Sequence, residues 1–253
     1  MGLTQGNSTL VIAHRGASLD APENTIPAFI KAWEINADAI EFDIRETLDN
    51  ELVCIHDANL ERVTRKTDAI SEVKYSDLSK IDVGLWRDKK FKNTFIPTLA
   101  EIIKIKPKNK MAFVEIKPSE ISLEKLKNFV AKRDLVPEEF HFLCFYPRII
   151  NLLKENFPQF KVTASIIPAF IDYEFEKIKK IIEKYDSYGI SMHVDSKKSI
   201  NLIKKLKEEG KFCLAWTVNS KEMMRDLLAV NVDGIITDNP KELITIKEEM
   251  RIE

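Results

Sequence analysis

Short apolar runs alternate strictly with longer stretches of helical periodicity along this chain. The stretches between the runs are roughly 10–15 residues long, as crossover helices are. Strands that alternate with helices pair in parallel, so the pattern predicts an α/β fold with a parallel sheet. Eight runs rich in β-branched and aromatic residues are predicted strands: Leu10–His14, Ala39–Arg45, Met111–Lys117, Phe140–Phe145, Lys161–Ile167, Tyr188–Val194, Phe212–Val218 and Gly234–Asp238.

The helical stretches are apolar on one side only. In one of them Phe175, Ile178 and Ile182 recur at helical spacing, while Lys179 and Lys180 fill the other face. Eight parallel strands with helices covered on one side favour a closed (β/α)8 TIM barrel over an open doubly wound sheet. A barrel of this kind typically needs about 250 residues. We therefore expect residues 1–253 to form a single TIM-barrel domain.

The alternation is interrupted after the second predicted strand. A further short run, Glu51–Asp57, follows it across a turn, and residues 58–97 then precede the next helix. We therefore expect a small insertion in the second βα loop. Active sites of TIM barrels lie on the face built from these loops, so an insertion there would cap the site and select substrates. Trp86, Phe91 and Phe95 are expected either to line that cap or to form the insertion's own small core.

Charge and composition argue against several classes of function. Lys plus Arg number 39 and Asp plus Glu 40, a net charge of −1, so the basic surplus expected of a protein that binds nucleic acid or anionic membranes is absent. No apolar run approaches the roughly 18 residues of a membrane span, and the N-terminus does not resemble a secretion signal. Cys54, Cys144 and Cys213 each lie in an apolar stretch and are predicted to be buried, reduced thiols. We expect a cytoplasmic location; the sequence leaves the oligomeric state open.

Carboxylates on two predicted strands share one face of the sheet. Residues two apart on a strand point the same way, which pairs Glu41 with Asp43 and Glu115 with Lys117. Barrel interiors are normally apolar, and burying unpaired charges costs several kcal/mol. One explanation is an ion-pair network with Lys117 and Arg15. The other is a hard divalent cation held by Glu41, Asp43 and Glu115, namely Mg2+ or Ca2+, with Mn2+ a further candidate; the absence of clustered Cys or His argues against zinc.

Two histidines end apolar runs at the same end of the sheet as these carboxylates: His14 in VIAHRG and His56 in VCIHDA. A lone histidine is more often structural, but two at the exits of neighbouring strands indicate a proton-transfer pair, because imidazole titrates near neutral pH. Arg15 has the planar fork that suits a phosphate, and Gly16 permits close backbone approach. Together with Lys117, these residues fit phosphoryl chemistry better than carbonyl chemistry.

An ordered set of motifs extends across nearly the whole chain. Individually they are short and weak, but in order and spacing they resemble the glycerophosphodiester phosphodiesterase (GDPD) family. The resemblance implies a TIM barrel that hydrolyses glycerophosphodiesters to an alcohol and sn-glycerol 3-phosphate with a divalent cation. The motifs are HRGASLDAPENT (14–25), EFD (41–43), CIHD (54–57), VEIK (114–117), AWTVN (215–219) and DGIITDNP (233–240).

The resemblance also implies roles for single residues. By motif, the acid/base pair is His14 and His56, the metal ligands are Glu41, Asp43 and Glu115, and the phosphate contacts are Arg15 and Lys117. The implied reaction uses one histidine to remove the proton of the glycerol 2-hydroxyl, which attacks phosphorus, and the other to protonate the departing alcohol. Water then opens the cyclic phosphate with the histidine roles reversed.

Other matched positions are less sharply defined. Trp216 would line the glycerol or alcohol pocket, or lie at the top of the barrel core. Glu23 would reach the metal or orient a group that bears a ligand, and His193 would lie near the mouth in a surface or hydrogen-bonded role. Asn24 is explained as a helix cap and Asp238 as a turn and capping residue.

Three alternative functions stay open. A lysophospholipase D or sphingomyelinase-D-like phosphodiesterase would act on lipids, and a broad apolar surface on the insertion would favour it. A metal-dependent lyase acting on a keto acid would use similar carboxylates but would not need both His14 and His56. A non-catalytic binding barrel is disfavoured because every matched catalytic position is filled.

Overall fold

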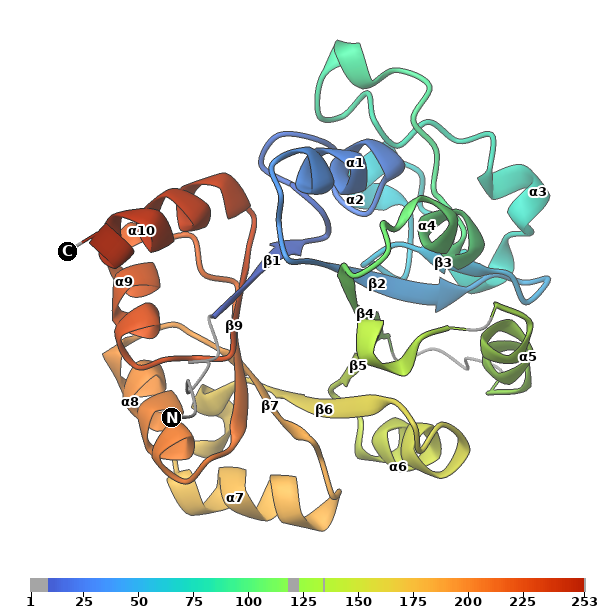
Figure 1. Cartoon of the computed structure of the whole chain (residues 1–253). Helices are drawn as coiled ribbons and strands as arrows, with labels where there is room; N and C mark the ends of the chain where they lie inside the picture. Colours follow the sequence, from blue (N-terminus) through green and yellow to red (C-terminus); the bar gives the residue numbers. More distant parts are fainter. Residues whose placement is uncertain (1–8, 118–122, 134, 253) are drawn as a thin grey trace.

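Parallel strands close into a barrel in the computed structural model, which describes residues 9–117, 123–133 and 135–252 (Figure 1). The barrel strands are β1 (Leu10–His14), β2 (Ala39–Glu46), β4 (Met111–Ile116), β5 (Phe140–Cys144), β6 (Lys161–Ile166), β7 (Gly189–His193), β8 (Phe212–Trp216) and β9 (Gly234–Thr237). β1 pairs in parallel with β2 on one side and with β9 on the other, which closes the ring. The TIM barrel predicted from the alternation of strands and helices is confirmed.

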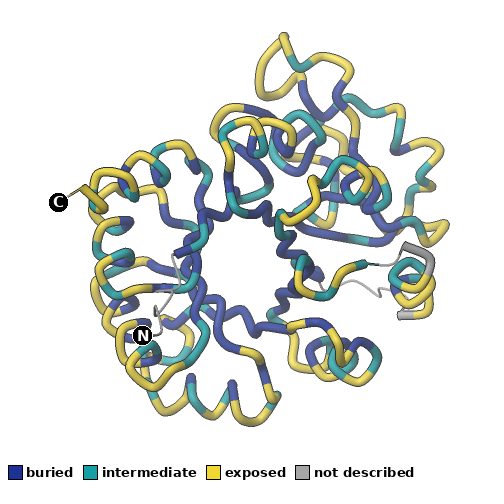
Figure 2. The backbone as a smooth tube through the Cα atoms, viewed as in Figure 1, coloured by how far each residue is buried: buried dark blue, intermediate teal, exposed yellow. Residues whose placement is uncertain are grey.

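Helices surround the barrel on its outside, and Figure 2 shows an inner ring of buried backbone beneath an exposed outer surface. They are α1 (Ile26–Glu34), α4 (Leu99–Ile105), α5 (Leu123–Arg133), α6 (Pro147–Asn156), α7 (Phe175–Lys184), α8 (Lys197–Glu208), α9 (Lys221–Ala229) and α10 (Pro240–Ile252). α7 illustrates their one-sided packing, because Ile178 and Ile182 are buried while Lys180 is exposed. Among the described residues, no helix has the length and apolarity needed to cross a membrane.

The barrel interior is a packed core. Ile12, Leu143, Leu214 and Ile236 are among the side chains that fill it. His141 on β5 is also buried there, between the rings of Phe113 and Phe212, with ring centroids 5.1 and 5.4 Å away. Its Nε2 lies 2.6 Å from the hydroxyl of Thr163 on β6. Burial lowers the pKa of His141 to about 3, so this imidazole is neutral at physiological pH.

The chain between β2 and α4 departs from the simple strand and helix repeat. β3 (Leu52–Cys54) runs antiparallel to β2, and α2 (Glu61–Thr64), η1 (Ile70–Glu72), α3 (Tyr75–Leu78) and η2 (Lys89–Phe91) follow it. This segment has its own apolar core, made of Val53, Ile55, Leu60, Val63, Ile70, Leu78, Val83 and Ile96.

Trp86, Phe91 and Phe95 were expected either to line the capped site or to form the core of this segment, and they do neither. Trp86 and Phe95 are 41% and 40% exposed, and Phe91 is half-buried. None of the three belongs to the segment's apolar core or lines the central cavity of the barrel. Both predictions for these aromatics are therefore wrong, because smaller aliphatic side chains fill the segment's interior instead.

Candidate active site

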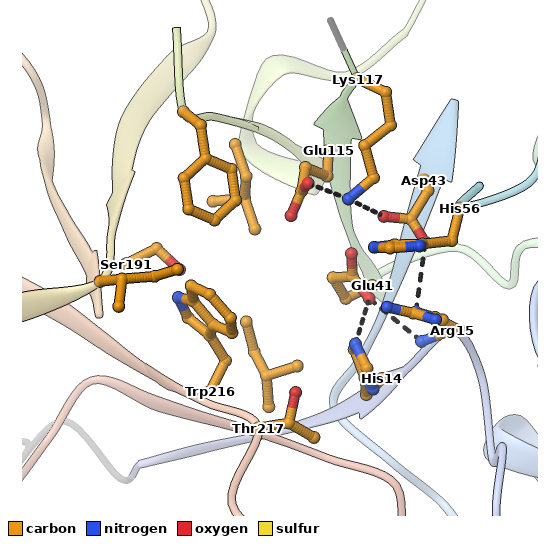
Figure 3. A pocket seen from close by; sticks show the side chains of 14 residues that line it. His14, Arg15, Glu41, Asp43, His56, Glu115, Lys117, Ser191, Trp216 and Thr217 are labelled. Carbon is orange, nitrogen blue, oxygen red and sulfur yellow. Dashed lines mark hydrogen bonds and ion pairs between the residues drawn. The ribbon is translucent and has the colours of Figure 1, made fainter. Parts of the chain in front are cut away.

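The carboxyl ends of the barrel strands surround a cavity of about 280 Å³ (Figure 3). One wall of it is charged and comes from the ends of β1, β2 and β4 and from the loop after β3; the opposite wall is largely apolar. The charged wall holds all seven residues that the motifs singled out for chemistry: His14, Arg15, Glu41, Asp43, His56, Glu115 and Lys117. Trp216 lies on the apolar wall, and the other apolar residues that line the cavity are Leu143, Phe145, Ile167 and Ile236.

Three carboxylates form the centre of the charged wall. One oxygen from each of Glu41, Asp43 and Glu115 lies within 4.8 Å of the others, and Glu41 and Asp43 are buried. Lys117 Nζ is 2.8 Å from Asp43 Oδ1 and also binds Glu115, while Arg15 Nε is 3.3 Å from Asp43 Oδ2. The sequence left two explanations open for these charges, an ion-pair network and a carboxylate site for a cation. In the structure both are built from the same residues.

The charge balance within this cluster shows that it fits a hard cation. Burial and the charge of Asp43 raise the pKa of Glu41 to about 8, and the same two causes raise the pKa of Glu115. Burial alone would also raise the pKa of Asp43, but the neighbouring cations Lys117 and Arg15 lower it well below its usual range. The ionised forms of Glu41 and Glu115 are therefore disfavoured without a further positive charge, and a divalent ion with oxygen ligands would stabilise them.

Asn24 holds Asp43 from the side away from Lys117. Its Nδ2 donates to Asp43 Oδ2 at 2.8 Å, and its Oδ1 accepts the Asp43 backbone N–H at 3.3 Å and the Cys54 thiol at 3.1 Å. Its backbone is left-handed, with φ of 55°, a conformation that asparagine tolerates. Thr25 occupies the N-cap of α1, so the prediction of Asn24 as a helix cap is wrong; its amide is used on Asp43 instead.

His14, at the end of β1, is held by Asp238. Its Nδ1 lies 2.6 Å from Asp238 Oδ1, which also accepts from the Ser18 hydroxyl at 2.8 Å, and Asn219 Nδ2 donates to the other oxygen at 2.6 Å. Although burial opposes it, the hydrogen bond from His14 lowers the pKa of Asp238 to about 2. The carboxylate is thus an acceptor and Nδ1 carries the proton, so Nε2 faces Glu41, 4.0 Å away. Asp238 thus orients a histidine, and the prediction of Asp238 as a capping residue is wrong because the Oδ1 of Asn239 accepts the Glu242 N–H of α10 at 3.2 Å instead.

His56 is held in the same way by its sequence neighbour, since its Nδ1 lies 2.8 Å from Asp57 Oδ1. Burial lowers the pKa of His56, although the charge of Asp43 opposes the shift. Burial also acts to lower the pKa of His14, but the hydrogen bond to Asp238 and the charge of Glu41 raise it overall. Opposite shifts on two imidazoles at one cavity suit a pair in which one donates a proton and the other accepts one.

Arg15 has an unusual backbone that serves the site. Its φ of 54° is left-handed, and its N–H donates to Glu41 Oε2 at 3.1 Å. Gly16 follows with φ of 81°, and a Cβ there would lie 2.7 Å from the backbone of Ala28, so only glycine fits. The Arg15 guanidinium donates to Glu23 at 2.7 Å. Glu23 lies behind Arg15, does not line the central cavity and is not part of the carboxylate cluster.

Trp216 and His193 lie together on neighbouring strands opposite the carboxylates. Trp216 lines the cavity, and Phe145 meets its ring edge-on with centroids 5.5 Å apart. The His193 ring packs against Trp216 at 5.0 Å and is not among the cavity residues. The structure thus brings together all the predicted site residues except Glu23 and His193, each of which supports a residue that lines the cavity.

One rim of the barrel holds carboxylates suited to a hard cation, cationic side chains suited to a phosphate, and oriented imidazoles. These are the groups that a TIM-barrel phosphodiesterase needs. The sequence matches the glycerophosphoryl diester phosphodiesterase family over residues 14–242, and the chain belongs to that family. The resemblance seen in the ordered motifs is therefore confirmed.

Relatives match over almost the whole chain. It is 32% identical over 241 residues to YhdW of Bacillus subtilis, covering 92% of this chain and 96% of that protein. It is 30% identical over 267 residues to a glycerophosphodiester phosphodiesterase of Caldanaerobacter subterraneus, covering 94% and 97%. The solved structure of a phosphodiesterase of Oleispira antarctica, in complex with the product sn-glycerol-3-phosphate, matches with a TM-score of 0.81 at 24% identity. The match covers 94% of this chain and 96% of that one, and it supports the fold.

Proposed function

We propose that this protein hydrolyses glycerophosphodiesters to an alcohol and sn-glycerol 3-phosphate with the help of one divalent cation. The observation that carries the proposal is that His14 and His56, each with Nδ1 bound to a carboxylate, line the same cavity as the carboxylate cluster. Membership of the family supports the reaction type. The name of the Caldanaerobacter relative and the product bound to the Oleispira enzyme support the substrate class.

Glu41, Asp43 and Glu115 would hold the cation, which their oxygen ligands select as Mg2+, Ca2+ or Mn2+. When bound, the cation would supply Lewis-acid stabilisation of the negative charge on the phosphate. Lys117 already binds two of these carboxylates, so its ammonium lies where it would also meet a phosphate oxygen. Arg15 would provide a second cationic contact to the phosphate from the opposite side of Asp43.

The two histidines would carry the protons. One imidazole removes the proton of the glycerol 2-hydroxyl, whose oxygen attacks phosphorus and forms a cyclic phosphate as the bond to the alcohol oxygen breaks. The other imidazole protonates that departing oxygen. Water then opens the cyclic phosphate with the two roles reversed. Asp238 binds Nδ1 of His14 and Asp57 binds Nδ1 of His56. Nε2 of each ring is therefore the atom that would accept or donate the proton.

The apolar wall would receive the carbon skeleton of the substrate. Trp216 and Phe145 present ring surface, and Ile167 adds an aliphatic side chain. This wall faces the charged wall across the cavity, so a bound diester would place its phosphate toward Arg15 and Lys117. Such a division of the cavity suits a substrate with one strongly charged centre and uncharged carbon on either side.

The direct test is a panel of diesters assayed for cleavage by the product that each one releases, which is sn-glycerol 3-phosphate for a glycerophosphodiester, the free head-group alcohol for a lysophospholipid and the coloured alcohol for a chromogenic substrate. Glycerophosphocholine, glycerophosphoethanolamine and glycerophosphoglycerol are compared with a lysophospholipid and a chromogenic phosphodiester, each with Mg2+, Ca2+, Mn2+ or EDTA. We expect turnover of at least one water-soluble glycerophosphodiester that stops in EDTA and returns with a divalent ion. Full activity after thorough chelation would contradict the metal site, and cleavage of the lysophospholipid alone would favour the lipid alternative.

A further inference from the structure

Arg62 is a charged residue on α2 that lies outside the central cavity and that the motifs did not single out. Its guanidinium forms a bidentate ion pair with Glu23, in which Nη1 lies 2.7 Å from Oε2 and Nη2 lies 2.8 Å from Oε1. Its Nε donates to Asp57 Oδ2 at 2.6 Å. All three nitrogens of one planar side chain are thus engaged, although the side chain is 42% exposed.

Both partners of Arg62 hold a residue of the site. Glu23 accepts from Arg15 Nη1 at 2.7 Å, and Asp57 binds His56 Nδ1 at 2.8 Å. An unbroken chain of ion pairs and hydrogen bonds therefore joins the loop after β1, which carries Arg15, to the loop after β3, which carries His56. Arg62 is the link between the two halves of this chain.

The electrostatics agree with the geometry. Burial alone would raise the pKa of Glu23, but the hydrogen bonds from Arg62 and the charge of Arg15 lower it overall. Burial likewise acts to raise the pKa of Asp57, and the hydrogen bonds from His56 and Arg62 lower it. Both acids are therefore ionised acceptors. A single ammonium group would not span both of them as the planar fork of Arg62 does.

We propose that Arg62 is a positioning residue for phosphodiester hydrolysis. It acts through Asp57 to fix the ring of His56 and through Glu23 to fix the guanidinium of Arg15. The inference rests on the proposed function, and it gives the segment between β3 and α4 a part in the reaction. Arg62 makes no ion pair with Glu41, Asp43 or Glu115 in the described part of the chain, and Lys117 and Asn24 hold Asp43 independently of Arg15, so loss of Arg62 should spare the carboxylate cluster.

The test compares Arg62→Gln, Arg62→Lys and the control Arg65→Gln. Arg65 lies on the same segment, lines the same surface hollow as Arg62 and has no ion pair among the described residues. We expect Arg62→Gln to lower kcat on the best diester by about 10- to 100-fold, as losses of supporting hydrogen bonds do, with Mg2+ affinity by calorimetry and Tm near wild type. Arg62→Lys should recover part of the loss. Arg65→Gln should behave as wild type.

A double-mutant cycle separates positioning from general damage. If Arg62 acts in part through His56, then Arg62→Gln should cost less kcat when added to His56→Ala than when made in the wild type, because one of the two groups it positions is already gone and only the path to Arg15 remains. Full multiplication of the two losses, or an Arg62→Gln loss that comes with weaker Mg2+ binding and a lower Tm, would overturn the positioning role.

A readout without turnover keeps this inference distinct from the proposed function. The measurement is nitrogen NMR on protein whose histidines carry an isotope label. Arg62→Gln should shift the imidazole nitrogen resonances of His56 and leave those of His14 in place, because His14 is held by Asp238. Unchanged resonances for His56 would overturn the proposal even if the enzyme is active. A shift of His56 alone would support it even if glycerophosphodiesters prove to be the wrong substrate.

Discussion

The side-chain amide of Asn24 donates a 2.8 Å hydrogen bond to the carboxylate of Asp43 and at the same time accepts that residue's backbone N–H. One residue at the end of the loop after β1 thereby fixes both the main chain and the carboxylate of a residue in β2. Supporting hydrogen bonds of this kind orient metal ligands, and losing one typically costs about 10- to 100-fold in metal affinity or activity.

Replacing Asn24 should therefore weaken cation binding without unfolding the protein. Asn24→Gly keeps a residue that accepts the left-handed φ of 55° but removes both bonds to Asp43. We expect the Kd for Mg2+, measured by calorimetry, to rise by about 10- to 100-fold. Asn36→Gly is the matched control, because Asn36 is also left-handed, with φ of 60°, and among the described residues its side chain binds only Lys110. Wild-type Mg2+ affinity in Asn24→Gly would show that the amide does not support the site.

The raised pKa of Glu41 predicts that cation binding depends on pH. A cation needs the carboxylate, and burial beside Asp43 raises the pKa of Glu41 to about 8, so Mg2+ must displace a proton at neutral pH. Affinity should rise as the pH rises toward about 8, and calorimetry in buffers of different ionisation enthalpy should detect proton release. Glu41→Gln should abolish the release. Binding with no proton uptake by the buffer would contradict this ionisation state.

The raised pKa of Glu41 also makes the free energy of unfolding of the metal-free protein depend on pH. Because the pKa of Glu41 is raised above its ordinary value of 4.5, its contribution to the free energy of unfolding is present at low pH and is lost as the pH rises through about 8. Urea unfolding in EDTA should therefore give a lower free energy at about pH 9 than at about pH 6.5, and Glu41→Gln should flatten that difference. An equally steep loss in Glu41→Gln would place its origin elsewhere.

His141 predicts a loss of stability in acid. Its pKa is lowered to about 3 by burial, so its contribution is present above the ordinary value of 6.5 and is lost as the pH falls from there toward about 3. His141→Gln should be less stable than wild type at neutral pH, because it loses the packing between Phe113 and Phe212. Its free energy of unfolding should nevertheless fall less between about pH 7 and pH 5. Parallel pH dependence in the two proteins would contradict the prediction.

Asp238→Asn tests whether the carboxylate orients His14. The amide can still meet Nδ1 but cannot enforce the tautomer in which Nδ1 carries the proton. We expect kcat to fall by about 10²- to 10⁴-fold with a Tm close to wild type. The same acid-to-amide change at an exposed acid on α9, Glu222→Gln, should leave kcat unchanged. Wild-type turnover in Asp238→Asn would leave the hydrogen bond without a catalytic purpose.

Strand periodicity was enough to place the residues that share a face of the barrel. Glu41 and Asp43 are two apart on β2, and the end of β1 brings His14 beside them, so the cavity and its charged wall could be predicted. Supporting contacts that join distant parts of the chain could not be predicted. Asp238 lies 224 residues from its partner His14 and Arg62 lies 39 from Glu23, and no local pattern indicates which loop side chains will meet.

The proposed mechanism requires His14 and His56 to act as one proton-transfer unit at the cavity. The most direct measurement is kcat of His14→Ala, His56→Ala and the double variant on the best glycerophosphodiester, with Mg2+ affinity measured alongside. Each single change should lower kcat by about 10²- to 10⁴-fold with little change in Mg2+ affinity, and the double variant should be hardly worse than either. Turnover near wild type in either single variant would contradict the two-histidine mechanism.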